Sequence, residues 1–138
     1  MNDYEQQTKE CFKKHGITMK IGSAKYSPCD WDGGHNHYSY PVTLSKDGKS
    51  MRIMFIQSRT AGSTPPTEYD VVSVLTMSDP GSFKNFCEEL GYDINSRKDE
   101  NTYKAVKRQW KSLVRVFGEG ECLEDLRKVE QGIGIRIR

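Results

Sequence analysis

The first 60 residues combine one helical hydrophobic pattern with several alternating ones. Residues 3–15 carry Tyr4, Cys11 and Phe12 at helical spacing, and Gly16 follows as a helix-ending residue. Three later runs alternate apolar and polar residues, as strands do, over 17–21, 38–44 and 50–56. An Asp-Gly pair at 47–48 predicts a tight hairpin between the last two runs. We therefore expect a helix and an antiparallel meander of about three strands.

The second half has helical patterns only, until its last residues. Thr67 and Asp70 form a capping-box pattern ahead of a helix that carries Val71, Val72, Val74 and Leu75. Asp79-Pro80 is the expected cap of a short helix with four apolar residues on one face, namely Phe83, Phe86, Cys87 and Leu90. Ser96 and Gly118 bracket a long helix over about 97–117, and a last helix is expected over about 121–130.

These elements predict an α+β fold in which a small antiparallel sheet of three to four strands packs against four to five helices. The 138 residues fit a single domain over 1–138. Within it, 1–60 is the helix and the β-meander, and 67–131 is the helical part. The alternating tail 132–138 suits an added edge strand of this sheet or of a partner, and a loose tail is the alternative.

The composition and the N-terminal residues predict a cytoplasmic protein. No run approaches about 18 consecutive apolar residues, so we expect no transmembrane helix and no membrane partner. The polar start, Met1 to Glu5, has no secretory signal pattern. The four cysteines, Cys11, Cys29, Cys87 and Cys122, form no CxxC pair, so free thiols in a reducing compartment are expected.

The long predicted helix concentrates the positive charge. The whole chain has a net charge of +2, but residues 97–115 hold seven cations and two carboxylates. The helix turns its apolar side to the core with Tyr103, Val106, Trp110, Leu113, Val114 and Phe117. About 140° away lies a basic stripe, made of Lys104, Lys107, Arg108, Lys111 and Arg115. This stripe suits phosphates or an acidic protein, and an ordinary solvated helix face is the alternative.

A loop over 27–37 holds a candidate metal site. Cys29, His35 and His37 carry the side chains that zinc prefers, and Asp32, Cys11 or Cys122 can supply a fourth ligand. The spacing C-x5-H-x-H matches no strong zinc signature, so zinc is a candidate cofactor only. The alternative is a polar loop in which the two histidines flank the start of a strand.

Catalytic signatures are missing from the sequence. There is no GxSxG, no HExxH and no Walker loop, and the paired carboxylates at 88–89 and 99–100 lie in polar helical stretches. Nothing in the pattern predicts the burial that raises a carboxyl pKa for acid catalysis. We therefore expect a binding protein and no enzyme.

A set of short motifs between residues 65 and 106 forms a pattern found in other proteins: Pro65-Pro66-Thr67, Asp70-Val71-Val72, Val74-Leu75, Phe83, Phe86-Cys87, Glu89, Gly91-Tyr92-Asp93, Asn95-Ser96-Arg97-Lys98 and Thr102-Tyr103-Lys104-Ala105-Val106. With these motifs, residues 17–118 resemble a widespread group of small phage and prophage proteins. The resemblance implies a protein that occupies a surface of a host machine, as anti-CRISPR inhibitors do. Its expected partner is a host protein or ribonucleoprotein complex such as a Cas effector.

Two alternatives stay open at this point. A phage accessory protein can bind nucleic acid directly through the basic helix, and a metal-dependent enzyme can use the Cys29 loop. The chain is expected to be a monomer or a dimer, because the alternating tail permits strand exchange.

Overall fold

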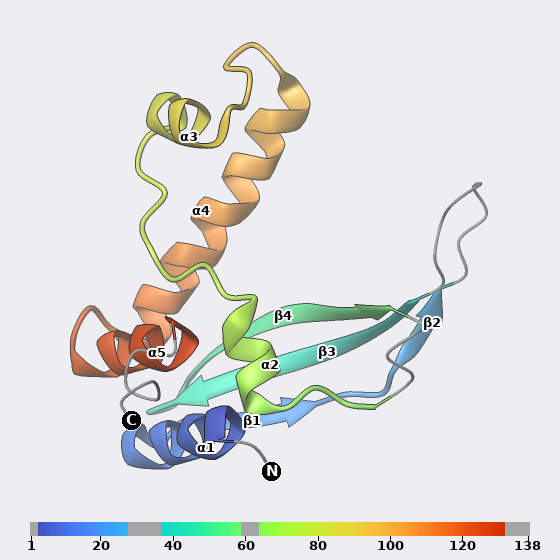
Figure 1. Cartoon of the computed structure of the whole chain (residues 1–138), viewed down its shortest axis with the longest axis vertical. Helices are drawn as coiled ribbons and strands as arrows, with labels where there is room; N and C mark the ends of the chain where they lie inside the picture. Colours follow the sequence, from blue (N-terminus) through green and yellow to red (C-terminus); the bar gives the residue numbers. More distant parts are fainter. Residues whose placement is uncertain (1–2, 28–36, 59–63, 132–138) are drawn as a thin grey trace.

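The computed structural model describes residues 3–27, 37–58 and 64–131. The helices are α1 (Asp3–His15), α2 (Glu68–Ser73), α3 (Phe83–Leu90), α4 (Arg97–Phe117) and α5 (Glu121–Gln131). The strands are β1 (Thr18–Ile21), β2 (Lys25–Ser27), β3 (His37–Lys46) and β4 (Lys49–Ser58). This arrangement confirms the predicted α+β fold (Figure 1).

The sheet is antiparallel and centred on β3. Strand β4 pairs with β3 along its whole length, and β1 and β2 share the opposite edge of β3. Between them the Gly22 N–H donates a hydrogen bond to the Pro41 carbonyl, 2.8 Å away. The predicted meander is therefore confirmed: β1 matches the strand predicted at 17–21, and β2 is a further strand that was not predicted. No pattern predicted β2, because three residues are too few to show an alternation.

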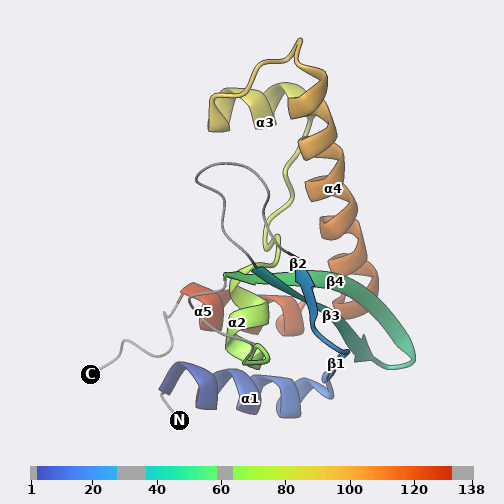
Figure 2. The ribbon, with the colours of Figure 1, turned by 90° about the vertical axis from the view of Figure 1, so that its right-hand side faces the viewer.

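One face of the sheet forms one side of the hydrophobic core. Tyr40, Val42 and Leu44 on β3 are almost fully buried, and Met51 on β4 lies on the same face. Figure 2 shows α1, α2 and α5 together on one side of the sheet, and their buried residues join a single core cluster with those of β3. Helix α4 completes this cluster through Trp110, Leu113, Val116 and Phe117. Removing this apolar area from water is the main stabilising term of such a core.

Helix α3 and the first half of α4 form an arm that projects beyond the sheet (Figures 1 and 2). The arm has its own aromatic contacts, with ring centroids 5.2 to 5.3 Å apart among Phe83, Phe86, Tyr92 and Tyr103. Aromatic pairs at such distances stabilise small clusters beyond their buried area. The arm is therefore held by local packing in addition to its continuity with α4.

Two predictions for α3 are wrong. Its cap is Ser82, whose hydroxyl accepts a hydrogen bond from the Asn85 N–H, because Asp79 closes a turn onto the Gly81 N–H instead. Leu90 does not join the buried face with Phe86, since its side chain is 57% exposed at the end of the helix. The capping box at Thr67 and the bounds of α4 are confirmed.

Gly22→Ala is expected to lower the free energy of unfolding by about 1–3 kcal/mol, because overpacking forces the backbone apart. A β-carbon at Gly22 would lie 2.6 Å from Cγ of the rigid Pro41 ring. Urea denaturation measures the effect, with Ser23→Ala at the exposed neighbouring position as control. Equal stability of the two variants would contradict the close approach of β1 to β3.

Candidate macromolecule-binding surface

Helix α4 presents the predicted basic stripe opposite its core contacts. Trp110, Leu113 and Phe117 are buried, and the solvent side of the helix carries the exposed side chains of Lys104, Arg108, Lys111 and Arg115. The apolar prediction was incomplete, because Val116 is also buried and Val106 and Val114 are half-buried. Val116 is 4% exposed and belongs to the core cluster, so the core contact of α4 is broader than the predicted apolar stripe.

Lys107 differs from the rest of the stripe. Its Nζ lies 2.8 Å from Asp79 Oδ1, and its side chain is 28% exposed. The hydrogen bond to Lys107 holds the pKa of Asp79 below its usual range, and the same contact raises the pKa of Lys107. Lys107 thus attaches the segment before α3 to the arm, where the Tyr103 hydroxyl also donates to the Gly81 carbonyl at 2.5 Å. Its charge is already matched within the chain.

Four stripe residues have no ion pair within the described part of the chain, and we call them the free cations: Lys104, Arg108, Lys111 and Arg115. They recur at i, i+4, i+7 and i+11, so they form one row about 16 Å long. Arg115 donates to the neutral Ser50 carbonyl at 2.8 Å, which fixes the side chain and leaves its charge unbalanced. Such a row attracts carboxylates or phosphates.

A groove runs between α4 and β4 beside the free cations. We call it the β4 groove; it has a volume of about 310 Å³ and is lined by Arg52, Met54, Val74, Ala105 and Arg108, among others. Met54 and Val74 are 55% and 51% exposed, and Ile56 farther along β4 is 61% exposed. A second hollow of about 290 Å³ lies among Tyr103 and four stripe residues. The surface therefore combines cations with exposed apolar side chains.

Met54, Ile56 and Val74 were not predicted as part of a binding surface. Residues 51–56 are apolar at nearly every position, with Arg52 as the exception. A strand with apolar residues on both faces indicates contacts on both faces, and this pattern was the signal in the sequence that could have identified the site. Only the face with Met51 is covered by the core, and Met54 and Ile56 lie on the opposite face.

The predicted zinc loop lies largely outside the described residues. Cys29, His35 and Asp32 fall there, and His37 is described only as the first residue of β3. Burial raises the pKa of the Cys11 thiol to about 11, and burial also raises the pKa of Cys122, so neither readily forms the thiolate that binds zinc. Within the described residues, no group of three or more His, Cys, Asp or Glu side chains is arranged to hold a metal ion.

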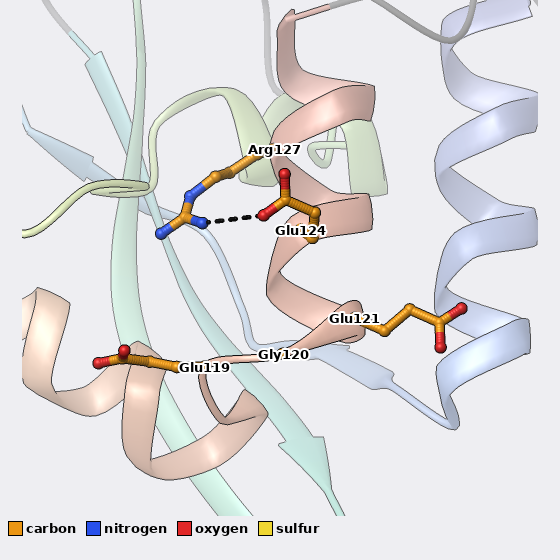
Figure 3. A pocket seen from close by; sticks show the side chains of 5 residues that line it. All are labelled: Glu119, Gly120, Glu121, Glu124 and Arg127. Carbon is orange, nitrogen blue, oxygen red and sulfur yellow. Dashed lines mark hydrogen bonds and ion pairs between the residues drawn. The ribbon is translucent and has the colours of Figure 1, made fainter.

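An acidic hollow at the start of α5 is a third concave feature (Figure 3). It is lined by Glu119, Gly120, Glu121, Glu124 and Arg127. Figure 3 shows Glu121 pointing toward α1, where it pairs with Lys14 at 2.9 Å, and Glu119 pointing the other way. Glu124 pairs with Arg127 at 3.3 Å. Because the carboxylates diverge and two of them are already paired, the hollow does not form a cation site.

Asp125 joins α5 to α1 and gives the fold a pH dependence. Hydrogen bonds from His15 Nε2 at 2.8 Å and Lys14 Nζ at 3.0 Å hold the pKa of Asp125 below its usual range. A lowered carboxyl pKa stabilises the folded state above the unfolded value of about 4, and the contribution is lost as pH falls through the folded value.

Asp125→Ala is expected to lower the free energy of unfolding at pH 7 by about 1–3 kcal/mol, since two charge-assisted hydrogen bonds are lost. The difference from the wild type should shrink as the pH is lowered below about 4. Urea denaturation across a pH series measures both effects. A difference that stays constant down to the lowest pH would show that the Asp125 charge is not involved.

In the part of the chain that the structure describes, no helix is long and apolar enough to cross a membrane. No protein-family model, curated protein or solved structure matches this chain. The surface formed by the free cations and the β4 groove is therefore the strongest guide to function that the chain offers.

Proposed function

We propose that this protein acts by binding and blocking a host nuclease complex, with a Cas effector as the concrete candidate partner. The observation that supports the proposal best is the row of four free cations beside the exposed apolar side chains of the β4 groove. Protein interfaces combine apolar anchors with a charged rim in this way. The setting, a phage protein directed at a host machine, comes from the resemblance of residues 17–118.

Inhibition by occupation requires a stable scaffold and a complementary surface, and no bond-making chemistry. The scaffold is a shared core to which α4 contributes four buried side chains. The thiols that the structure describes are poor nucleophiles, because burial raises the pKa of Cys11, Cys87 and Cys122. These features favour a binding role over a catalytic one.

The proposal is tested by capture and by inhibition. The tagged full chain is incubated with a lysate of a bacterium that carries a nuclease-based defence system, and the captured proteins are identified by mass spectrometry. We expect a nuclease complex whose DNA cleavage stops at an equimolar amount of this protein. Capture of metabolic enzymes alone, with cleavage unaffected by an excess of the protein, would contradict the proposal.

Direct binding of nucleic acid is the second candidate, and the regular spacing of the free cations favours it. A row about 16 Å long can contact several phosphates of one strand. Binding of this kind weakens with salt, with a slope of about −0.9 per phosphate neutralised on duplex DNA. Fluorescence anisotropy with labelled duplex DNA and single-stranded RNA measures it, and no binding at low salt would exclude this candidate.

A further inference from the structure

The β3–β4 hairpin determines which backbone groups of β4 face away from the sheet. Asp47 and Gly48 both have positive φ, 51° and 79°, as a two-residue type I′ turn requires. In such a hairpin the closing pair Lys46–Lys49 is hydrogen-bonded, and bonded and non-bonded pairs then alternate along the strands. The odd-numbered residues of β4 bond to β3, so the even-numbered ones direct their N–H and C=O groups outward.

Pro41 supports this assignment. It stands opposite Met54 and has no N–H to donate, which suits a non-bonded pair. Its carbonyl accepts from Gly22 on the β1 side, away from β4. The outward backbone groups of Arg52, Met54 and Ile56 have no hydrogen-bond partner among the described residues, whereas the Ser50 carbonyl is taken by Arg115.

This edge lacks most of the features that protect sheet edges from a further strand. Proteins usually place charges, proline or a bulge on such an edge. Arg52 is the only charged side chain among the residues 50–56, and Met54 and Ile56 expose more than half of their side-chain surface. Helix α4 approaches β4 near Ser50 and diverges from it toward the other end of the strand (Figure 1). Among the described residues, no strand pairs with β4 along this edge over 52–56, and the β4 groove lies beside it.

We propose that an extended segment of a partner protein, with apolar residues alternating with aspartate or glutamate, adds to β4 as a new strand. This inference rests on the proposed binding function and specifies its partner as a protein. Outward backbone groups of β4 would supply hydrogen bonds, as in other strand additions. Alternate side chains of the segment would reach Met54 and Ile56 on one face, and the carboxylates between them would meet Arg108 across the β4 groove.

Charge distinguishes this occupant from two others. A second copy of this chain would bring a second set of Arg52 and Arg108 to the same edge, which like-charge repulsion opposes. A nucleic acid would pair with the cations through its phosphates. Phosphates accept hydrogen bonds and do not donate them, so the outward C=O groups of β4 would have no partner. Met54 and Ile56 would also stay exposed. An acidic extended polypeptide satisfies the Arg108 charge, the outward backbone groups and the apolar side chains together.

The test uses a nine-residue peptide in which valine and glutamate alternate, and a matched peptide in which valine and lysine alternate. Isothermal titration with the full chain should detect the glutamate peptide only. Met54→Pro removes one outward N–H and leaves every hydrogen bond between β4 and β3 intact. We therefore expect it to weaken binding of the glutamate peptide about tenfold or more. Met54→Ala keeps the N–H and should bind the peptide much more strongly than Met54→Pro does.

A second measurement does not depend on the folding of Met54→Pro. In NMR spectra of the wild type, the peptide should shift the amide resonances of Arg52, Met54 and Ile56 and slow their hydrogen exchange. Equal binding of both peptides, no change at these amides, or a dimer of the chain alone that occupies this edge would overturn the inference. Unaltered binding by folded Met54→Pro would overturn it as well.

Failure of the inference and failure of the proposed function give different results. Lys104 and Lys111 do not line the β4 groove. Charge reversal at these two residues tests the free cations alone, whereas Met54→Pro tests the edge alone. If only the lysine reversals abolish capture of the nuclease complex, the function stands without strand addition. If only Met54→Pro abolishes capture of the nuclease complex, strand addition stands, and the proposed role of the free cations is wrong.

Discussion

Reversing the charge of Lys104, Arg108 and Lys111 together is expected to weaken binding of the captured partner about 100-fold, at roughly 1 kcal/mol per reversed charge. The three side chains are exposed and have no ion pair within the described chain, so the fold should lose little stability. Arg115 is left unchanged because it also bonds the Ser50 carbonyl. Biolayer interferometry with the purified complex measures the affinity.

The control for this experiment reverses three other exposed lysines. Lys13, Lys20 and Lys128 lie on α1, β1 and α5, and none has an ion pair within the described residues. The control variant has the same net charge as the test variant, so a general effect of charge on association would weaken both. Equal affinity of the two variants would show that the free cations are not the contact.

Leu113→Ala is expected to lower the free energy of unfolding by about 2–5 kcal/mol, because it leaves a cavity in a close-packed core. Leu113 is fully buried where α4 joins the core cluster. Its loss affects the attachment of the whole helix that displays the free cations. Urea denaturation followed by circular dichroism measures the change.

Leu90→Ala is the matched control for that experiment. It makes the same chemical change at a side chain that is 57% exposed, so we expect a change within about 0.5 kcal/mol. If the two leucine variants lost equal stability, the placement of α4 against the sheet would be wrong.

Local patterns in the sequence were sufficient to predict the helices and the hairpin. Apolar spacing, Ser96 and Gly118 predicted α4 close to its observed bounds, and the Asp-Gly pair predicted the turn that sets the register of β3 and β4. The cap of α3 was misplaced because Asp79 accepts from the Gly81 N–H in a turn and also pairs with Lys107, which is distant in sequence. Local rules take no account of such contacts.

The candidate surface was predicted only in part. Helical geometry was enough to predict the basic stripe, because the positions of side chains around a helix do not depend on tertiary contacts. It could not show that Lys107 is paired within the chain, or that Arg115 reaches the edge of β4. The apolar half of the surface, with Met54, Ile56 and Val74, depends on which side of β4 the helices leave uncovered. Alternation along a strand shows two faces and does not identify the covered one.

Lysine footprinting of the complex tests the central claim most directly. The protein is acetylated briefly, alone and bound to its partner, and the modification of each lysine is measured by mass spectrometry. We predict that Lys104 and Lys111 lose most of their reactivity in the complex, while Lys13, Lys20 and Lys128 keep theirs. Unchanged reactivity of Lys104 and Lys111 in a saturated complex would contradict the assignment of α4 as the binding surface.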